Sequence, residues 1–78
     1  MKEVLVYSRT GCHLCEIAID HIKSVKDDLG FNLEIKLIDI NEDLEKEYGE
    51  QVPVILIDNK VHDYWRVDLE RFTKAIKS

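Results

Sequence analysis

Residues 9–18 read RTGCHLCEIA and place Cys12 and Cys15 one helical turn apart, at the point where a loop is predicted to run into a helix. Three roles fit such a pair: a disulfide that exchanges with other thiols, a clamp for a soft metal ion, or two buried thiols that only pack. A redox or metal role is the more common one when the pair begins a helix. The elements around the pair discriminate between these roles.

Four short segments are predicted to be β-strands. Residues 3–7 (EVLVY) and 54–57 (VILI) are almost continuous apolar runs, the pattern of strands covered on both faces. Residues 33–38 (LEIKLI) and 61–65 (VHDYW) mix apolar and polar side chains, as strands with a wetter face or a free edge do. The first two strands are therefore expected at the centre of a sheet, and the other two at its margins.

Three segments are predicted to be helices. The first spans about residues 13–28 and stops at Gly30, the second begins at the N-cap Asn41 and ends at Gly49, and Asp68 caps the third. Apolar residues at helical spacing are expected to face the core from the first helix: Leu14, Ile17, Ala18, Ile22, Val25 and Leu29. The corresponding stripe on the third helix is Leu69, Phe72 and Ile76.

These elements predict an α/β fold of the order β-α-β-α-β-β-α, in a single domain over residues 1–78. The first helix crosses over between two parallel strands, and Asp58-Asn59-Lys60 turns a closing hairpin. Two central and two marginal strands predict a four-stranded mixed sheet in the order 2-1-3-4. Ligands of open α/β sheets collect outside the carboxyl ends of the strands, and Cys12 follows the first strand at that edge.

Composition limits the setting in which this fold works. The chain has 78 residues, two cysteines and a formal net charge of -5, and polyanions such as nucleic acids bind chiefly through Lys and Arg. No apolar run approaches the roughly 18 residues of a bilayer span, and the start MKEVLVYS lacks the apolar core of a signal peptide. We therefore expect a cytoplasmic monomer with no nucleic-acid or membrane partner, where reducing conditions disfavour a permanent disulfide.

The positions of the two cysteines predict their roles in exchange. Cys12 lies at the helix entrance, where unpaired N–H groups and the helix dipole favour negative charge, so we expect it to be the nucleophile. Cys15 follows on the same side, near the predicted buried stripe, and is the expected resolving thiol. Gly11 leaves the backbone open to a substrate, and Arg9 is placed to hold an anionic one. His13 is expected to have an auxiliary role at most.

Pro53 is the chain's one proline and stands directly before a predicted central strand, where its missing N–H would break a ladder bond. A cis Val52-Pro53 bond would compensate, because it turns the chain sharply and leaves the peptide groups of Val52 able to pair with an extended substrate. Val52 and Pro53 are therefore expected in the substrate site, beside the sulfurs.

Cys-x-x-Cys after the first strand, the element order and Val-Pro before the third strand together resemble the thioredoxin fold, and within it the glutaredoxins. The run Ser8-Arg9-Thr10-Gly11-Cys12 resembles the Ser-Lys-Thr-x-Cys entry of that family, and Gln51-Val52-Pro53 resembles its Thr-Val-Pro. The resemblance puts Arg9 in the place of a lysine that meets the carboxylate of glutathione. Asp63-Tyr64-Trp65-Arg66 replaces the Gly-Gly of the family, which implies a divergent branch for which glutathione is a poor reductant.

The function expected from these observations is that of a thiol-disulfide oxidoreductase or redox carrier. It would act on protein disulfides or glutathione-mixed disulfides and be restored by a cellular thiol reductant, with glutathione as a candidate reductant or substrate and no tightly bound cofactor. The alternatives are a soft-metal carrier for Cu(I) or zinc that uses the same pair, and a noncatalytic module that bridges two chains through zinc or a cluster. No dedicated metal site is expected beyond the cysteine pair.

Other notable residues have more ordinary interpretations. His21 and His62 are expected to be structural or solvated. Tyr64 and Trp65 are interpreted as a lid on the core, with a partner-binding patch as the less favoured alternative. Five acidic residues are expected to form a solvated helix face, with the steering of basic partners as the alternative; they are Glu42, Asp43, Glu45, Glu47 and Glu50.

Overall fold

The computed structural model describes residues 2–49, 51–65 and 67–77, so Glu50 and Arg66 lie outside the described residues. The strands are β1 (Glu3–Ser8), β2 (Asn32–Leu37), β3 (Val54–Ile57) and β4 (Lys60–Tyr64). The helices are α1 (His13–Leu29), α2 (Glu42–Tyr48) and α3 (Leu69–Lys77), with a short 3-10 helix, η1 (Ile38–Ile40), before α2. The predicted order is confirmed, although η1 was not expected and several element ends shift by a residue.

The four strands form one mixed sheet in the predicted order, β2-β1-β3-β4. β1 runs parallel to β2, with Val6 opposite Ile35, and β3 runs antiparallel to both β1 and β4. Every residue of β3 is buried, as expected of a central strand, whereas most of β2 is exposed at the sheet edge. Asp58 and Asn59 turn the β3-β4 hairpin with φ angles of 50° and 69°, the left-handed pair that a type I′ turn requires.

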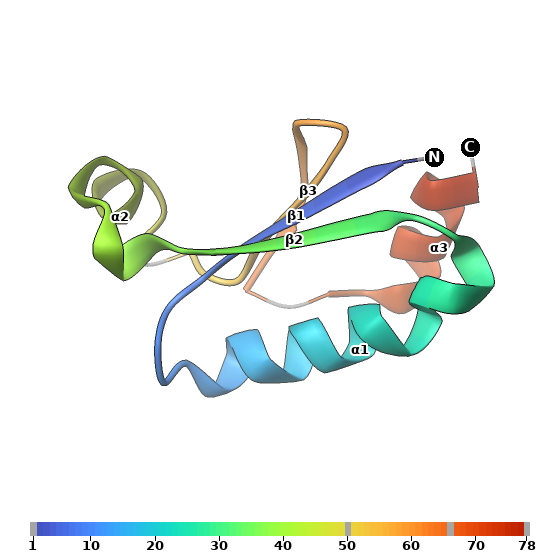
Figure 1. The fold of residues 1–78 in the computed structure, drawn as a ribbon, viewed down its shortest axis with the longest axis horizontal. Helices are drawn as coiled ribbons and strands as arrows, with labels where there is room; N and C mark the ends of the chain where they lie inside the picture. Colours follow the sequence, from blue (N-terminus) through green and yellow to red (C-terminus); the bar gives the residue numbers. More distant parts are fainter. Residues whose placement is uncertain (1, 50, 66, 78) are drawn as a thin grey trace.

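α1 and α3 pack on the sheet and on each other, and they enclose the main core (Figure 1). Val4 and Val6 of β1 point into this core, where the rings of Phe31 and Phe72 meet edge-on with centroids 5.4 Å apart. α2 lies at the opposite end of the molecule from α3, at the left of Figure 1, near the point where β1 finishes. The end of β1 that leads to the cysteines is therefore covered by a short helix and not by the main core.

The helix ends use the predicted caps. Gly30 closes α1 in the left-handed region, with φ 67°, and its N–H donates to the carbonyl of Lys26 over 2.8 Å. The side-chain oxygen of Asn41 accepts hydrogen bonds from the N–H groups of Asp43 and Leu44, at 3.0 and 3.2 Å. A carboxylate oxygen of Asp68 does the same at the start of α3. Each helix therefore starts where a side chain satisfies N–H groups that have no partner within the helix.

Two expectations about burial are wrong. Leu14 and Ile17 were predicted to face the core, but they are 54% and 40% exposed. The buried line of α1 runs instead through Cys15, Ala18 and Ile22, and each of the two exposed residues precedes a member of that line, about 100° around the helix.

Tyr64 and Trp65 do not cover the core either, because their side chains are 46% and 55% exposed. β4 is an edge strand that ends at Tyr64, and the α3 residue Phe72 packs against His62, further back on that strand. Across the described residues, every helix is too short or too polar to cross a bilayer.

Candidate active site

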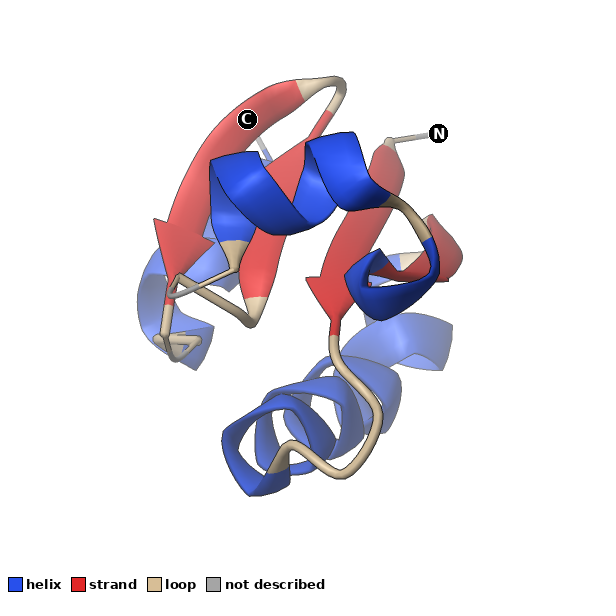
Figure 2. Cartoon of the chain, turned by 90° about the vertical axis from the view of Figure 1, so that its left-hand side faces the viewer, coloured by secondary structure: helices blue, strands red, loops and turns tan. Residues whose placement is uncertain are grey.

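Three segments come together at one end of the molecule: the loop between β1 and α1, the residues before β3, and the end of β4. Figure 2 shows them on the side that faces the viewer, with α2 above them. A small apolar cluster lies beneath, separate from the main core. Its buried members are Cys15, Ile38 and Val52, against which Tyr7, Cys12, Leu44 and Tyr48 pack. The cluster thus brings the two cysteines together with Val52.

Cys12 is the N-cap of α1, with an extended backbone at φ -85° and ψ 111°. Its Sγ accepts a hydrogen bond from the N–H of Cys15 over 3.4 Å, and its own N–H donates to the carbonyl of Arg9 over 3.1 Å. The side chain is partly exposed. A sulfur in this position receives one of the N–H groups that a helix leaves unpaired.

Cys15 is 1% exposed and therefore lies in different surroundings from Cys12. Burial raises the pKa of the Cys15 thiol, and the hydrogen bond to Cys12 raises it further. Hydrogen bonding with the Ser8 side chain and the Arg9 backbone partly offsets this by lowering the pKa. A thiol that solvent can reach thus lies beside a shielded thiol whose pKa is raised.

Ser8 belongs to the site although the sequence analysis gave it no role of its own. It is 4% exposed and follows Val4 and Val6 at the inward positions of β1. Buried polar groups almost always have a hydrogen-bond partner, and the thiol of Cys15 supplies one here. The signal for this contact in the sequence was a hydroxyl residue in the alternating row of inward-facing residues that begins with Val4 and Val6.

Gly11 adopts φ 75°, in the left-handed region where a side chain is strained. A Cβ built at Gly11 would have no atom within 4 Å, so the backbone angle and not crowding within the chain explains the glycine.

Val52 packs in the same cluster as the two cysteines, and Pro53 follows it in the chain. Both are buried, and the peptide bond between them is cis. The N–H of Trp65 donates to the carbonyl of Pro53 over 2.8 Å and to that of Gln51 over 3.2 Å. The backbone after β4 is therefore attached to the segment before β3, which places Trp65 beside the predicted substrate site.

Arg9 forms an ion pair within the chain. Its Nη2 lies 3.1 Å from a carboxylate oxygen of Glu45 on α2, and it would lie 3.3 Å from a Cβ at Gly49. The ring of Tyr7 also stacks on Tyr48 of α2, with centroids 4.7 Å apart. Arg9 thus holds α2 against the cysteine loop, a contact between distant segments that the sequence analysis did not find.

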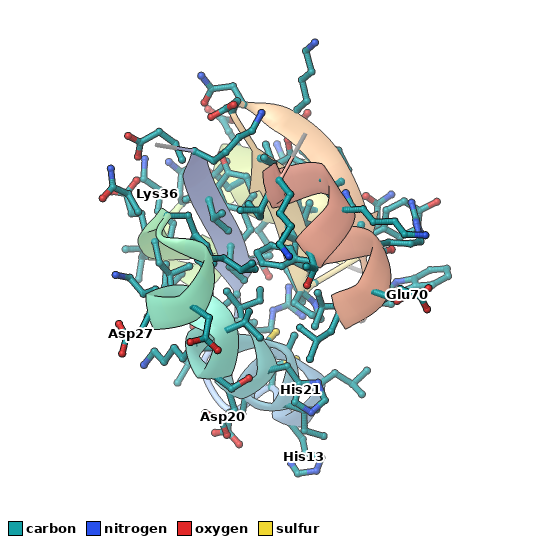
Figure 3. All side chains as sticks on the ribbon, turned by 90° about the vertical axis from the view of Figure 1, so that its right-hand side faces the viewer. His13, Asp20, His21, Asp27, Lys36 and Glu70 are labelled. Carbon is teal, nitrogen blue, oxygen red and sulfur yellow. The ribbon has the colours of Figure 1, made fainter. Side chains whose placement is uncertain are left out.

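His13 is 83% exposed, and its Nδ1 lies 3.9 Å from a carboxylate oxygen of Glu16. Figure 3 shows His13 and His21 pointing away from the body of the molecule. His62 is half-buried and meets the ring of Phe72 edge-on, with centroids 6.0 Å apart. Within the described part of the chain, no three His, Cys, Asp or Glu side chains cluster as metal ligands would. In that part of the chain, Cys12 and Cys15 therefore have no third side chain of these types beside them that could complete a metal site.

Comparison with known proteins shows the family to which the chain is similar. The family model of the glutaredoxin-like domain (DUF836) matches residues 3–77. The uncharacterized protein Rv0508 of Mycobacterium tuberculosis is 31% identical over 79 aligned positions, which cover 95% of this chain and 81% of that protein. Its counterpart in Mycobacterium bovis, the uncharacterized protein Mb0520, matches equally well.

Solved structures share the fold. The protein Ne2328 from Nitrosomonas europaea superposes with a TM-score of 0.82 at 32% identity, covering 95% of this chain and 89% of that chain. The protein XcR50 from X. campestris gives 0.79 at 26% identity, with 95% of each chain covered. A Fasciola hepatica thioredoxin gives 0.61 at 16% identity, covering 97% of this chain and 78% of that one, a likeness of fold alone. With its thioredoxin-like fold and a family match over residues 3–77, the chain belongs to the glutaredoxin-like domain family.

Proposed function

We propose that the protein is a thiol-disulfide oxidoreductase that cycles Cys12 and Cys15 between dithiol and disulfide. The observation that carries the proposal is the unequal pair: Cys12 Sγ is partly exposed and accepts the Cys15 N–H, while Cys15 is 1% exposed. An exposed sulfur at a helix N-terminus favours attack, and a shielded partner one turn away favours resolution. The glutaredoxin-like family of the chain is consistent with this chemistry.

The exchange has two steps that balance in electrons. The Cys12 thiolate attacks one sulfur of a substrate disulfide, which forms a mixed disulfide and expels the other substrate sulfur as a thiolate that takes up a proton. Cys15 then loses its proton to solvent and attacks Cys12 Sγ, which forms the intramolecular disulfide and releases the second substrate thiol. The substrate gains two electrons and the protein loses two. A cellular thiol reductant restores the dithiol, and no bound cofactor takes part.

Single cysteine variants test the assigned roles. We expect Cys12→Ser to lose exchange with a small neutral disulfide such as bis(2-hydroxyethyl) disulfide, because the remaining thiol, that of Cys15, is 1% exposed. We expect Cys15→Ser to complete the first step and to accumulate the Cys12 mixed disulfide, which intact-protein mass spectrometry detects as an added thiol. Equal loss of the first step in both variants would contradict the proposal. So would tight Cu(I) or zinc binding by a protein that exchanges no disulfide.

A further inference from the structure

We propose that the disulfide presented to Cys12 belongs to a protein segment that carries an apolar side chain next to its cysteine and basic residues nearby, and not to glutathione. This inference rests on the proposed function, since it names the substrate of the same site. It is based on two surfaces beside the cysteines: the aromatic ledge, formed by Tyr64 and Trp65, and the acidic face of α2.

The aromatic ledge is an exposed apolar surface attached to the site. The rings of Tyr64 and Trp65 meet edge-on with centroids 5.2 Å apart, and the two side chains are 46% and 55% exposed. The backbone N–H of Trp65 donates to the carbonyls of Gln51 and Pro53, which flank Val52 of the cysteine cluster. Exposed aromatic side chains of this kind serve well as contact points for a partner, because they offer a large area at a small entropic cost.

The backbone of the ledge adopts an uncommon conformation at Trp65. Trp65 has φ 71°, an angle that is uncommon for a bulky residue and strains the backbone. Strained backbone that leaves a large apolar side chain in solvent, beside reactive groups, is more typical of a contact surface than of a structural one.

The acidic face of α2 gives the same end of the molecule a negative potential. The helix reads EDLEKEY, with four carboxylates and one lysine, and its acidic residues are exposed. In Figure 2, α2 lies on the same side as the cysteine loop and the end of β4, and the contacts of α2 with Tyr7 and Arg9 hold it there. An acidic surface beside a reactive group attracts basic partners and repels anionic ones.

The same charges make glutathione a poor fit. Glutathione has two carboxylates and one ammonium group and is therefore an anion, which requires a cation at the site. Arg9, the cation of the cysteine loop, is already paired with Glu45 at 3.1 Å. Arg71 is paired as well: its Nη1 lies 3.7 Å from Oδ2 of Asp63, the residue before the ledge. Among the described residues, both of these cations are thus paired with carboxylates, so a basic, apolar segment gains more from the two surfaces than an acidic tripeptide does.

Matched substrates test the inference with one readout. Each thiol is supplied as its mixed disulfide with 2-thiopyridine, so attack by Cys12 on the substrate sulfur always releases the same chromophore, pyridine-2-thione. Four thiols are compared: 2-mercaptoethanol, glutathione, a peptide with leucine beside its cysteine and two lysines, and the same peptide with glutamates for the lysines. The Cys15→Ser variant is used so that only the first step is measured. We expect the lysine peptide to react about 10-fold faster than 2-mercaptoethanol, and glutathione to react no faster than 2-mercaptoethanol.

Variants of the ledge identify the surface responsible. In the Cys15→Ser background, we expect Trp65→Ala to lower the ratio of the lysine-peptide rate to the 2-mercaptoethanol rate by about 5-fold, with Tyr64→Ala acting in the same direction. Val61→Ala is the matched control, because Val61 is 53% exposed on the same strand but pairs with Leu56, away from the cysteines. That variant should keep the wild-type ratio.

The outcomes separate this inference from the proposed function. If all four substrates react at one rate, or glutathione reacts fastest, the inference is wrong and the proposed function stands. The inference also fails if Trp65→Ala and Val61→Ala leave the same ratio. If no substrate releases pyridine-2-thione, the proposed function is wrong, and the inference fails with it.

Discussion

At the scale of single residues, Cys12 and Cys15 differ most in their access to water. Cys12 is partly exposed at the N-terminus of α1, whereas Cys15, in the first turn of that helix, is 1% exposed. Burial also raises the pKa of the Cys15 thiol, so less thiolate is present there at a given pH. Cysteine modification depends on both the exposure and the thiolate fraction. The order in which the two thiols react therefore reports the asymmetry directly.

We expect iodoacetamide to modify Cys12 first in the reduced protein, and Cys15 at least about 10-fold more slowly near pH 8. The rate at Cys15 should go on rising as the pH increases further, because its pKa is raised. Peptide mapping by mass spectrometry after timed quenching measures both rates. In the protein unfolded by urea, the two rates should converge. Equal rates in the folded protein would show that the two thiols do not differ as described.

His62 makes stability depend on pH. Its Nε2 is buried without a hydrogen-bond partner among the described residues. Burial lowers the pKa of His62, the nearby Arg71 lowers it further, and Asp63 and Asp68 oppose the shift. A lowered pKa means that the folded state binds the proton less readily than the unfolded state. The stabilising contribution is therefore fully present above about pH 6.5, the ordinary value, and is lost as the pH falls through the folded-state pKa.

We expect the free energy of unfolding to fall between about pH 7 and pH 5 in the wild type, and to fall less in His62→Phe. Urea unfolding followed by circular dichroism at several pH values measures this difference. His21→Gln serves as the control because His21 is exposed. Parallel curves for the wild type and His62→Phe would contradict this account of His62.

At the scale of elements, α2 is too short to be stable alone and depends on its cap and its contacts. Asn41 satisfies the N–H groups of Asp43 and Leu44 at its start. We expect Asn41→Ala to lower the free energy of unfolding by about 1 kcal/mol, whereas Asn41→Asp should retain most of it because a carboxylate also caps well. Urea denaturation of the three proteins measures the difference. If Ala and Asp were equally destabilising, the cap would not be what stabilises α2.

The elements themselves could be predicted because each is specified by local chemistry. The apolar run VILI indicates a strand buried on both faces, and all of β3 is buried. Asn41, Asp68 and Gly30 mark helix ends, and the structure places the ends of α2, α3 and α1 beside them. Asp58 and Asn59 are residue types that tolerate positive φ, and both adopt it in the hairpin. These signals act over a few residues, so the sequence alone contains them.

Contacts between distant segments could not be predicted in the same way. Arg9 was expected to hold an anionic substrate, from its position and from the resemblance, and no local pattern indicated its ion pair with Glu45, which lies 36 residues further along the chain. Leu14 has the spacing of a core residue, yet it is 54% exposed because the buried line of the helix passes beside it. No local pattern distinguishes these outcomes, since they depend on how α1 and α2 are placed against the sheet.

At the scale of the whole molecule, stability depends on one main core. A domain of 78 residues buries a modest share of its surface, so its margin against unfolding is small. Phe72 is fully buried and packs edge-on against Phe31 in the centre of that core. We expect Phe72→Ala to cost about 3–5 kcal/mol and to leave much of the protein unfolded, and Phe72→Leu to cost clearly less. Thermal unfolding followed by circular dichroism measures both; equal losses would show that the volume of this side chain is not what matters.

The net charge of the molecule has a separate consequence, for the rate of encounter. A formal charge of -5, with an acidic helix next to the cysteines, attracts cations toward Cys12 over distances that salt can screen. We therefore expect the reaction of the lysine peptide to slow several-fold between about 0.02 M and about 0.5 M NaCl, and that of the glutamate peptide to speed up. The uncharged 2-mercaptoethanol disulfide should show little change and is the internal control. Stopped-flow absorbance of pyridine-2-thione gives all three curves. If the curves were parallel, the charge of α2 would have no part in bringing the substrate to the site.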